Sequence, residues 1–197
     1  MTRHVPPMDP ETSEADAAQL ALARAQGDAY QRALQHMTTE VAHAGGSRRA
    51  GEYLVGYAVE DAEGMYELRD GELRWRNPKG GENVHVEVAV CDAADGRFIP
   101  AVEVTVTLRS PAGATVGPQT LPLLWHPMLY HYGSDLAVPE DGDYTLHVHV
   151  EPPRFMRHDE VNGRRFLEPV DVEFTDVPLR RGAEPVDPPP APDPHEA

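Results

Sequence analysis

The chain has 197 residues, 40% of them hydrophobic, which is enough for one well-buried domain with residues left over for terminal extensions. Its formal net charge of -16, from 33 acidic against 17 basic residues, argues against a nucleic-acid or anionic-membrane partner and favours cations. The single cysteine, Cys91, excludes an intramolecular disulfide framework and any thiolate-rich metal cluster.

The sequence contains neither a membrane span nor a recognisable export signal. No run of 18 apolar residues occurs, which a transmembrane helix would require. The first thirty residues carry prolines and acidic residues where a signal peptide needs an uninterrupted apolar segment. Taken alone, the sequence predicts a cytoplasmic protein, or one whose export signal is not included in the chain.

Residues 9–44 are predicted to form one amphipathic helix. Asp9 is the candidate N-cap, Pro10 occupies the first helical position, and Gly45-Gly46 supplies the stop. A less polar stripe recurs at alternating steps of three and four residues, so the helix packs either on its own domain or on a partner helix. We expect packing on its own domain, because alanine and glycine weaken a free coiled coil. The stripe consists of Leu20, Ala23, Gly27, Tyr30, Leu34, Met37 and Val41.

From Glu52 onward, apolar and polar residues alternate with period two between turn residues, which is typical of an antiparallel β-sheet protein. Several short strands of this kind favour a sandwich, and Asp70-Gly71 indicates a tight hairpin between two of them. The fold class expected is therefore mainly β, an antiparallel β-sandwich with an N-terminal helical extension. The predicted strands are 52–60, 65–69, 72–76, 83–91, 99–108, 144–150 and 169–174.

The C-terminal residues are rich in proline and acidic residues, so they lack backbone donors and an apolar face to bury. We expect a disordered, Pro-rich tail there. The predicted organisation is a helical extension over residues 1–50, a β-sandwich domain over 51–178 and the tail over 179–197.

Ligand-type side chains interrupt the strand alternation in three places. Residues i and i+2 share one face of a strand, so His85 and Glu87 project together, and so do His147 and His149. The segment 125–133, expected to be a loop, adds His131 and Met128. Imidazole and carboxylate ligands suit copper, iron or zinc, and a thioether adds preference for copper. One such pair is weak support, but three clusters in one domain predict a transition-metal site.

Several short motifs, in the same order, resemble the bacterial periplasmic iron-transport-associated metal-binding proteins. The resemblance spans residues 52–176 and includes Val84-His85-Val86-Glu87-Val88, Gly96-Arg97-Phe98-Ile99-Pro100, His131-Tyr132-Gly133, His149-Val150-Glu151-Pro152-Pro153 and Phe166-Leu167-Glu168-Pro169-Val170. It implies an immunoglobulin-like β-sandwich, a homodimer, a copper or iron ion, and a membrane iron permease as partner. It also implies a periplasmic or extracellular location.

The same resemblance implies a set of metal ligands. His85, Glu87, His131 and His149 match the positions of the family's ligands. The family's methionine ligand lies further upstream of the Tyr–Gly histidine than Met128 lies from His131, so Met128 is the nearest substitute.

Three functions are open on this sequence. The leading hypothesis is non-enzymatic binding of copper or iron, with zinc as a further candidate, for iron uptake or metal handling. The second is a non-haem iron enzyme in which His85, Glu87 and His149 form a facial triad. The third is a binding module whose helix and Pro-rich tail recruit other proteins.

Overall fold

The computed structural model describes residues 9 and 11–184. Over these residues it contains one α-helix, one π-helical turn and a series of strands, ordered as follows: α1 (Ala17–His36), η1 (Met37–Val41), β1 (Ala44–Ala50), β2 (Tyr53–Glu60), β3 (Ala62–Glu63), β4 (Met65–Arg69), β5 (Glu72–Arg76), β6 (Val84–Asp92), β7 (Val104–Arg109), β8 (Thr115–Leu121), β9 (Leu123–Leu124), β10 (His131–Leu136), β11 (Gly142–Val150), β12 (Val170–Leu179) and β13 (Ala183–Glu184).

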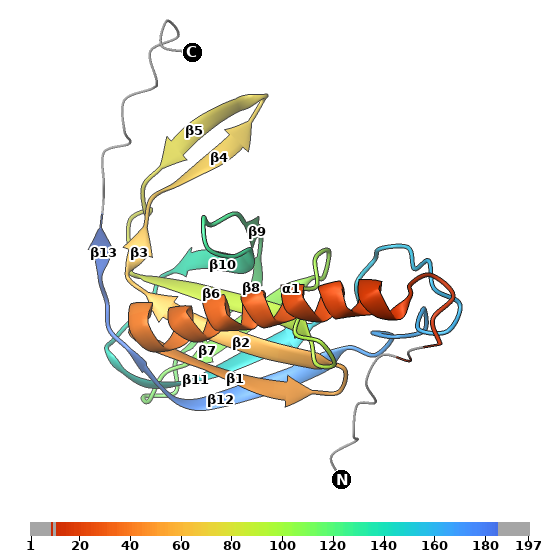
Figure 1. Cartoon of the computed structure of the whole chain (residues 1–197). Coiled ribbons are helices and arrows are strands. Elements are labelled where there is room, and N and C mark those ends of the chain that lie inside the picture. Colours follow the sequence, from red (N-terminus) through yellow and green to blue (C-terminus); the bar gives the residue numbers. More distant parts are fainter. Residues whose placement is uncertain (1–8, 10, 185–197) are drawn as a thin grey trace, which may run out of the picture.

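Two antiparallel sheets pack face to face as a sandwich (Figure 1). The first sheet has five strands in the order β1-β2-β6-β10-β9, and the second has four in the order β12-β11-β7-β8. The main core lies between them and is built largely from the valines and leucines of alternate strand positions. The predicted fold class, mainly β with an N-terminal helix, is confirmed.

Helix α1 lies along the outer face of the first sheet, the face turned away from the second sheet (Figure 1). A second apolar cluster forms between them, in which Leu34 and Met37 meet Ala58, Ala89 and Cys91 of the sheet. Most of the predicted stripe is at least partly buried, although Val41 at its end is 47% exposed. The helix therefore packs on its own domain, as expected.

The boundaries of this helix differ from the prediction. Asp9 does not cap it, because α1 starts only at Ala17, and the Asp9 carboxylate accepts a hydrogen bond from the N–H of Glu11 instead. The helix begins only after Asp16, which exchanges hydrogen bonds of 2.8 Å with Gln19 in a capping box. Pro10 lies outside the described residues. Gly45-Gly46 belongs to β1 instead of a helix stop, and a Cβ on Gly45 would lie 2.5 Å from the Thr38 carbonyl oxygen of η1.

Most predicted strands are present, with shifted ends. Segments 65–69 and 72–76 match β4 and β5, and their turn residues Asp70 and Gly71 have φ of 53° and 82°, the left-handed pair that a two-residue hairpin requires. This hairpin projects from the sandwich (Figure 1). Segment 99–108 is strand only from Val104, and β12 continues beyond the predicted 169–174.

The sequence missed β1, β8 and β10 among the longer strands. β1 and β8 are interrupted by glycine or proline, and His131 of β10 was expected in a loop. Within the predicted tail, Leu179 still belongs to β12, and β13 pairs in parallel with β3. Residues 185–197 lie outside the described residues. No helix in the described part of the chain is long and apolar enough to cross a membrane.

The close approach of α1 to the turn after β6 gives a stability prediction. A Cβ on Gly27 would overlap the carbonyl oxygen of Asp95. Gly27→Ala should therefore lower the free energy of unfolding by about 1–3 kcal/mol through overpacking, although alanine is the better helix former. Chemical denaturation measures this effect.

The matched control is Ala25→Gly on the exposed side of α1, which should cost only the difference in helix propensity, about 1 kcal/mol. A Gly27→Ala protein more stable than the parent would show that α1 is not held against this turn.

Candidate metal centre

Strand β6 places His85 and Glu87 on the outer face of the first sheet. The alternating valines of the strand point the other way and enter the core between the two sheets. All nine residues of β6 are nevertheless buried, because the outer face is covered by α1 and η1. The pair that the sequence would allow on a solvated surface is therefore held in a low-dielectric environment.

Strand β10 brings a second histidine to this face. It pairs antiparallel with β6, so that Gly133 lies opposite Glu87 and Asp135 opposite His85. His131, the first residue of β10, has its Nε2 3.1 Å from Glu87 Oε1, and His85 Nε2 lies 3.8 Å from the same oxygen. One ligand atom from each of these three side chains lies within 4.8 Å of the other two. The structure thus brings together three of the predicted ligands.

Asp135 fixes the orientation of the His85 ring. Its Oδ1 is 2.9 Å from His85 Nδ1, and neither side chain is exposed. Its other carboxylate oxygen accepts a hydrogen bond of 3.1 Å from Arg76. A carboxylate that accepts a hydrogen bond from Nδ1–H keeps the proton on that nitrogen, so the Nε2 lone pair of the imidazole is free to bind a metal ion. His85 Nε2 is the atom that faces Glu87.

Burial and neighbouring charges shift the protonation of the three groups. Burial, followed by the charges of His85 and His126, lowers the pKa of His131 to about 4. Burial raises the pKa of Glu87 to about 7, against the opposing effect of His85. Burial by itself lowers the pKa of His85, but the hydrogen bond to Asp135 and nearby carboxylates outweigh it, and the net pKa is raised. At neutral pH, the His131 imidazole is therefore neutral, the form that can bind a metal ion.

The hydrogen bonding of the buried imidazole nitrogens is incomplete, as expected for nitrogens that bind a metal ion. His85 Nε2 and His131 Nε2 are buried and make no well-formed hydrogen bond among the described residues, and both face the Glu87 carboxylate, at 3.8 and 3.1 Å. A buried polar atom without a partner costs about 1–3 kcal/mol, and an ion is one of the explanations for such atoms. Two imidazoles and a carboxylate are also a suitable donor set for copper, iron or zinc.

Gly133 keeps space open beside these nitrogens. A Cβ at this position would lie 2.9 Å from His85 Nε2 and 2.9 Å from a methyl carbon of Leu124. Any larger residue would therefore press on the imidazole nitrogen that is free to bind. In the sequence, the i, i+2, i+4 spacing of His131, Gly133 and Asp135 was consistent with one face of a strand. It was missed because residues 125–133 were expected to form a loop.

The other predicted ligands lie elsewhere. Met128 is half-buried at the edge of the apolar cluster under α1, and its backbone N–H donates to His126 Nδ1. The His126 ring has its centroid 6.2 Å from that of His131. His126 does not belong to the three-residue group. Met128 is not among the residues that line the small cavity beside Glu87 and His131.

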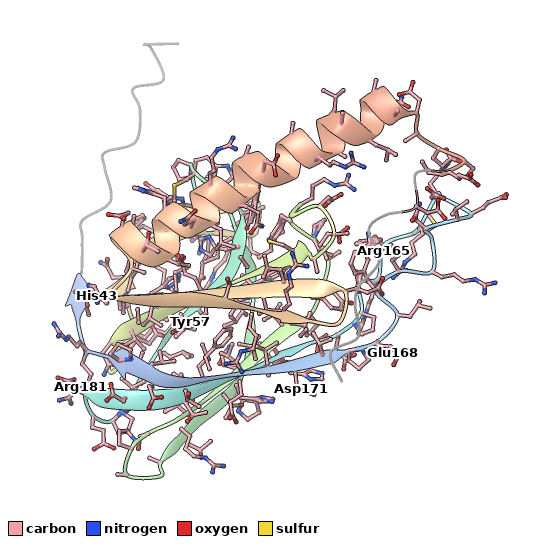
Figure 2. The ribbon with its side chains drawn as sticks, turned by 60° about the horizontal axis from the view of Figure 1, so that its bottom comes forward. His43, Tyr57, Arg165, Glu168, Asp171 and Arg181 are labelled. Carbon is pink, nitrogen blue, oxygen red and sulfur yellow. The ribbon has the colours of Figure 1, made fainter. Side chains whose placement is uncertain are left out.

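His149 is on the second sheet, not the first. Its Nδ1 lies 2.9 Å from Asp171, and its Nε2 lies 3.3 Å from Glu151. His147 is 3.2 Å from the same Asp171 carboxylate. Figure 2 shows Asp171 on the side of the sandwich away from α1. Because the whole core separates the two polar faces, a single chain does not bring His149, a ligand implied by the family resemblance, to His85.

Comparisons with known proteins agree with this architecture. Residues 76–178 match the family model described as Fe2+ transport protein. FetP of uropathogenic Escherichia coli strain F11 is 24% identical, with a TM-score of 0.56 over 68% of this chain and 95% of FetP. The copper-reconstituted P19 protein of Campylobacter jejuni is 18% identical, with a TM-score of 0.56 over 69% of this chain and 96% of P19.

These two structures share the fold of this chain, and no curated protein matches it significantly. The family match covers more than half of the sequence and includes His85, Glu87, His131 and Asp135. It agrees with the resemblance carried by the short motifs. The chain therefore belongs to the Fe2+ transport protein family.

Proposed function

We propose that this protein binds a transition-metal ion through His85, Glu87 and His131 and serves iron uptake. The observation that carries the proposal is the set of buried imidazole nitrogens without partners, gathered around a buried carboxylate. Membership of the Fe2+ transport protein family supports a role in iron uptake. The excess of acidic residues, with a net charge of -16, also favours attraction of cations to the protein.

Copper and iron are the metals we propose, with zinc as a competitor. Imidazole binds all three, and the carboxylate of Glu87 suits iron as well as oxidised copper. The similar structures of P19 and of a FetP variant are described as copper-reconstituted and copper-bound. Family membership favours iron, so both ions belong in the first titration.

The size of the site favours binding over catalysis. The cavity beside Glu87 and His131 has a volume of about 10 Å³, close to the roughly 10–15 Å³ needed for one water molecule. An iron oxygenase must hold oxygen and an organic substrate beside its metal, and the cavity lined by Glu87 and His131 has no room for both. The facial triad expected from His85, Glu87 and His149 is also not assembled within one chain. We therefore propose a non-enzymatic role.

A homodimer would give His149 a place in the site. Within one chain it lies on the outer face of the second sheet, so it can join His85 and His131 only from a second copy. The homodimer, a membrane iron permease as the receiving partner and a periplasmic location are parts of this proposal that follow from the family resemblance.

The first experiment is metal titration of the purified chain and of His85→Ala and His131→Ala. Elemental analysis and titration with Cu(II), Fe(II) and Zn(II) should give one ion per chain. Each variant should lose at least about 100-fold in affinity, because even a residue that only orients a ligand contributes about 10–100-fold. His158→Ala, whose side chain is 91% exposed, is the matched control and should bind normally. Absence of stoichiometric metal from the parent protein would refute the proposal.

The pH dependence of binding follows from the same groups. As pH falls through about 7, Glu87 takes up a proton that a metal must displace, and the raised pKa of His85 acts in the same direction. His131, with a pKa of about 4, adds nothing until far lower pH. Affinity should fall up to about tenfold per pH unit for each proton displaced. Glu87→Gln should flatten the dependence near neutral pH, and a parent affinity that stays constant from mildly acidic to neutral pH would contradict the assignment.

Asp135 should affect the site without touching the ion. Asp135→Asn removes the negative charge that orients His85 and balances Arg76. We expect a loss of about 10–100-fold in metal affinity at unchanged stoichiometry. Circular dichroism checks that the variant is folded, and an affinity equal to that of the parent would show that His85 needs no such support.

A further inference from the structure

We propose that Met37, contributed by the N-terminal helical segment, is a thioether ligand of the metal centre. This inference rests on the proposed function and concerns a part of the chain that the family model does not match, since the match begins at residue 76. It makes the helical extension part of the binding site and not only a cover for the sheet.

The geometry places Met37 at the wall of a small cavity that adjoins the proposed metal centre at Glu87 and His131. Glu87 and His131 line this small cavity from the sheet, and Leu34 and Met37 line it from the helical side. Met37 is only 3% exposed, so its side chain is enclosed with these residues. Of the two side chains on the helical side, only Met37 carries a donor atom. A metal ion that contacts Glu87 and His131 from the side of this cavity would therefore meet either the Leu34 side chain or the Met37 sulfur.

The local backbone gives a second, independent observation. Met37 is the first residue of the π-helical turn η1, where the N–H of Ala42 donates to the Met37 carbonyl oxygen at 3.0 Å. π-Helical turns are rare and occur frequently at functional sites. Here the change from α-helix to π-helix takes place at the residue that reaches the cavity.

Met128 is the competing thioether, and the structure favours Met37. Met128 is half-exposed and packs at the edge of the apolar cluster, and it is not among the residues that line the cavity. Met37 is fully enclosed and lines the cavity directly. A polarisable sulfur beside two imidazoles would bias the site toward Cu(I), because soft thioethers bind Cu(I) better than Zn(II) or Fe(II).

The test compares Met37→Leu with Met128→Leu in the full chain. Leucine conserves most of the volume of methionine, so both variants should fold, and thermal unfolding checks this. Cu(I) affinity is measured by competition with a chromogenic chelator, Zn(II) affinity by direct titration, and X-ray absorption of the copper-loaded protein reports whether sulfur is bound. Met37→Leu should remove the sulfur contribution and weaken Cu(I) binding at least tenfold, while Zn(II) affinity changes less than about threefold.

The remaining outcomes decide between this inference and the function on which it rests. A copper spectrum and Cu(I) affinity unchanged in Met37→Leu would overturn the inference while leaving the metal site of His85 and His131 in place. Loss of sulfur in Met128→Leu alone would assign the thioether to Met128 instead. Failure of the parent chain to bind any of the metals would overturn both proposals.

Discussion

The cover of the first sheet by α1 and η1 is the constraint on which the chemistry of the proposed metal centre depends. An antiparallel sheet of a sandwich commonly leaves its outer face to water, and there His85 and Glu87 would be hydrated residues. In this protein both side chains are buried, Glu87 beside Leu34 and Met37, so their polar atoms must find partners within the protein or in an ion. Burial is the largest cause of both the lowered pKa of His131 and the raised pKa of Glu87.

A network of charges supports this buried site from the side of the projecting hairpin. Arg76, the last residue of β5, forms ion pairs with Glu67, Glu82 and Asp135, and Asp135 in turn holds His85. The network connects the base of the hairpin to the proposed ligand His85 through the side chains of Arg76 and Asp135. Removal of either charged partner would leave a buried charge uncompensated, which is much more costly than the loss of a surface ion pair.

Two similar sequence patterns have different outcomes because of the layer that covers them. His85-Val86-Glu87 and His147-Val148-His149 both alternate ligand-type residues with a core valine. The first is buried, has a ring nitrogen without a well-formed hydrogen bond and lies close to His131 of β10. The second lies on the outer face of the other sheet, where carboxylates of Asp171 and Glu151 pair with His149. Only the first has the properties of a metal site within one chain.

Much of the fold could be predicted from the sequence, because strand alternation and helical periodicity are local patterns. These patterns predicted the sandwich, the β4–β5 hairpin and the stripe of α1 that packs on the sheet. Helix ends were less well predicted, since Asp9 and Asp16 are both plausible caps and only Asp16 has Gln19 three residues later. Strand β10 was missed because its histidine follows a segment, 125–130, that contains proline and no clear alternation.

The sequence by itself determined that His85 and Glu87 share a strand face, because the period of a strand is fixed by its backbone. It also determined the family, through motifs that stay in order along the chain. Only the tertiary structure decided which histidines meet. The register of β6 against β10 brings in His131 and Asp135, the sandwich separates His149 from them, and the docking of α1 brings Met37 to the cavity. Each of these depends on contacts between residues far apart in the chain, which no local spacing specifies.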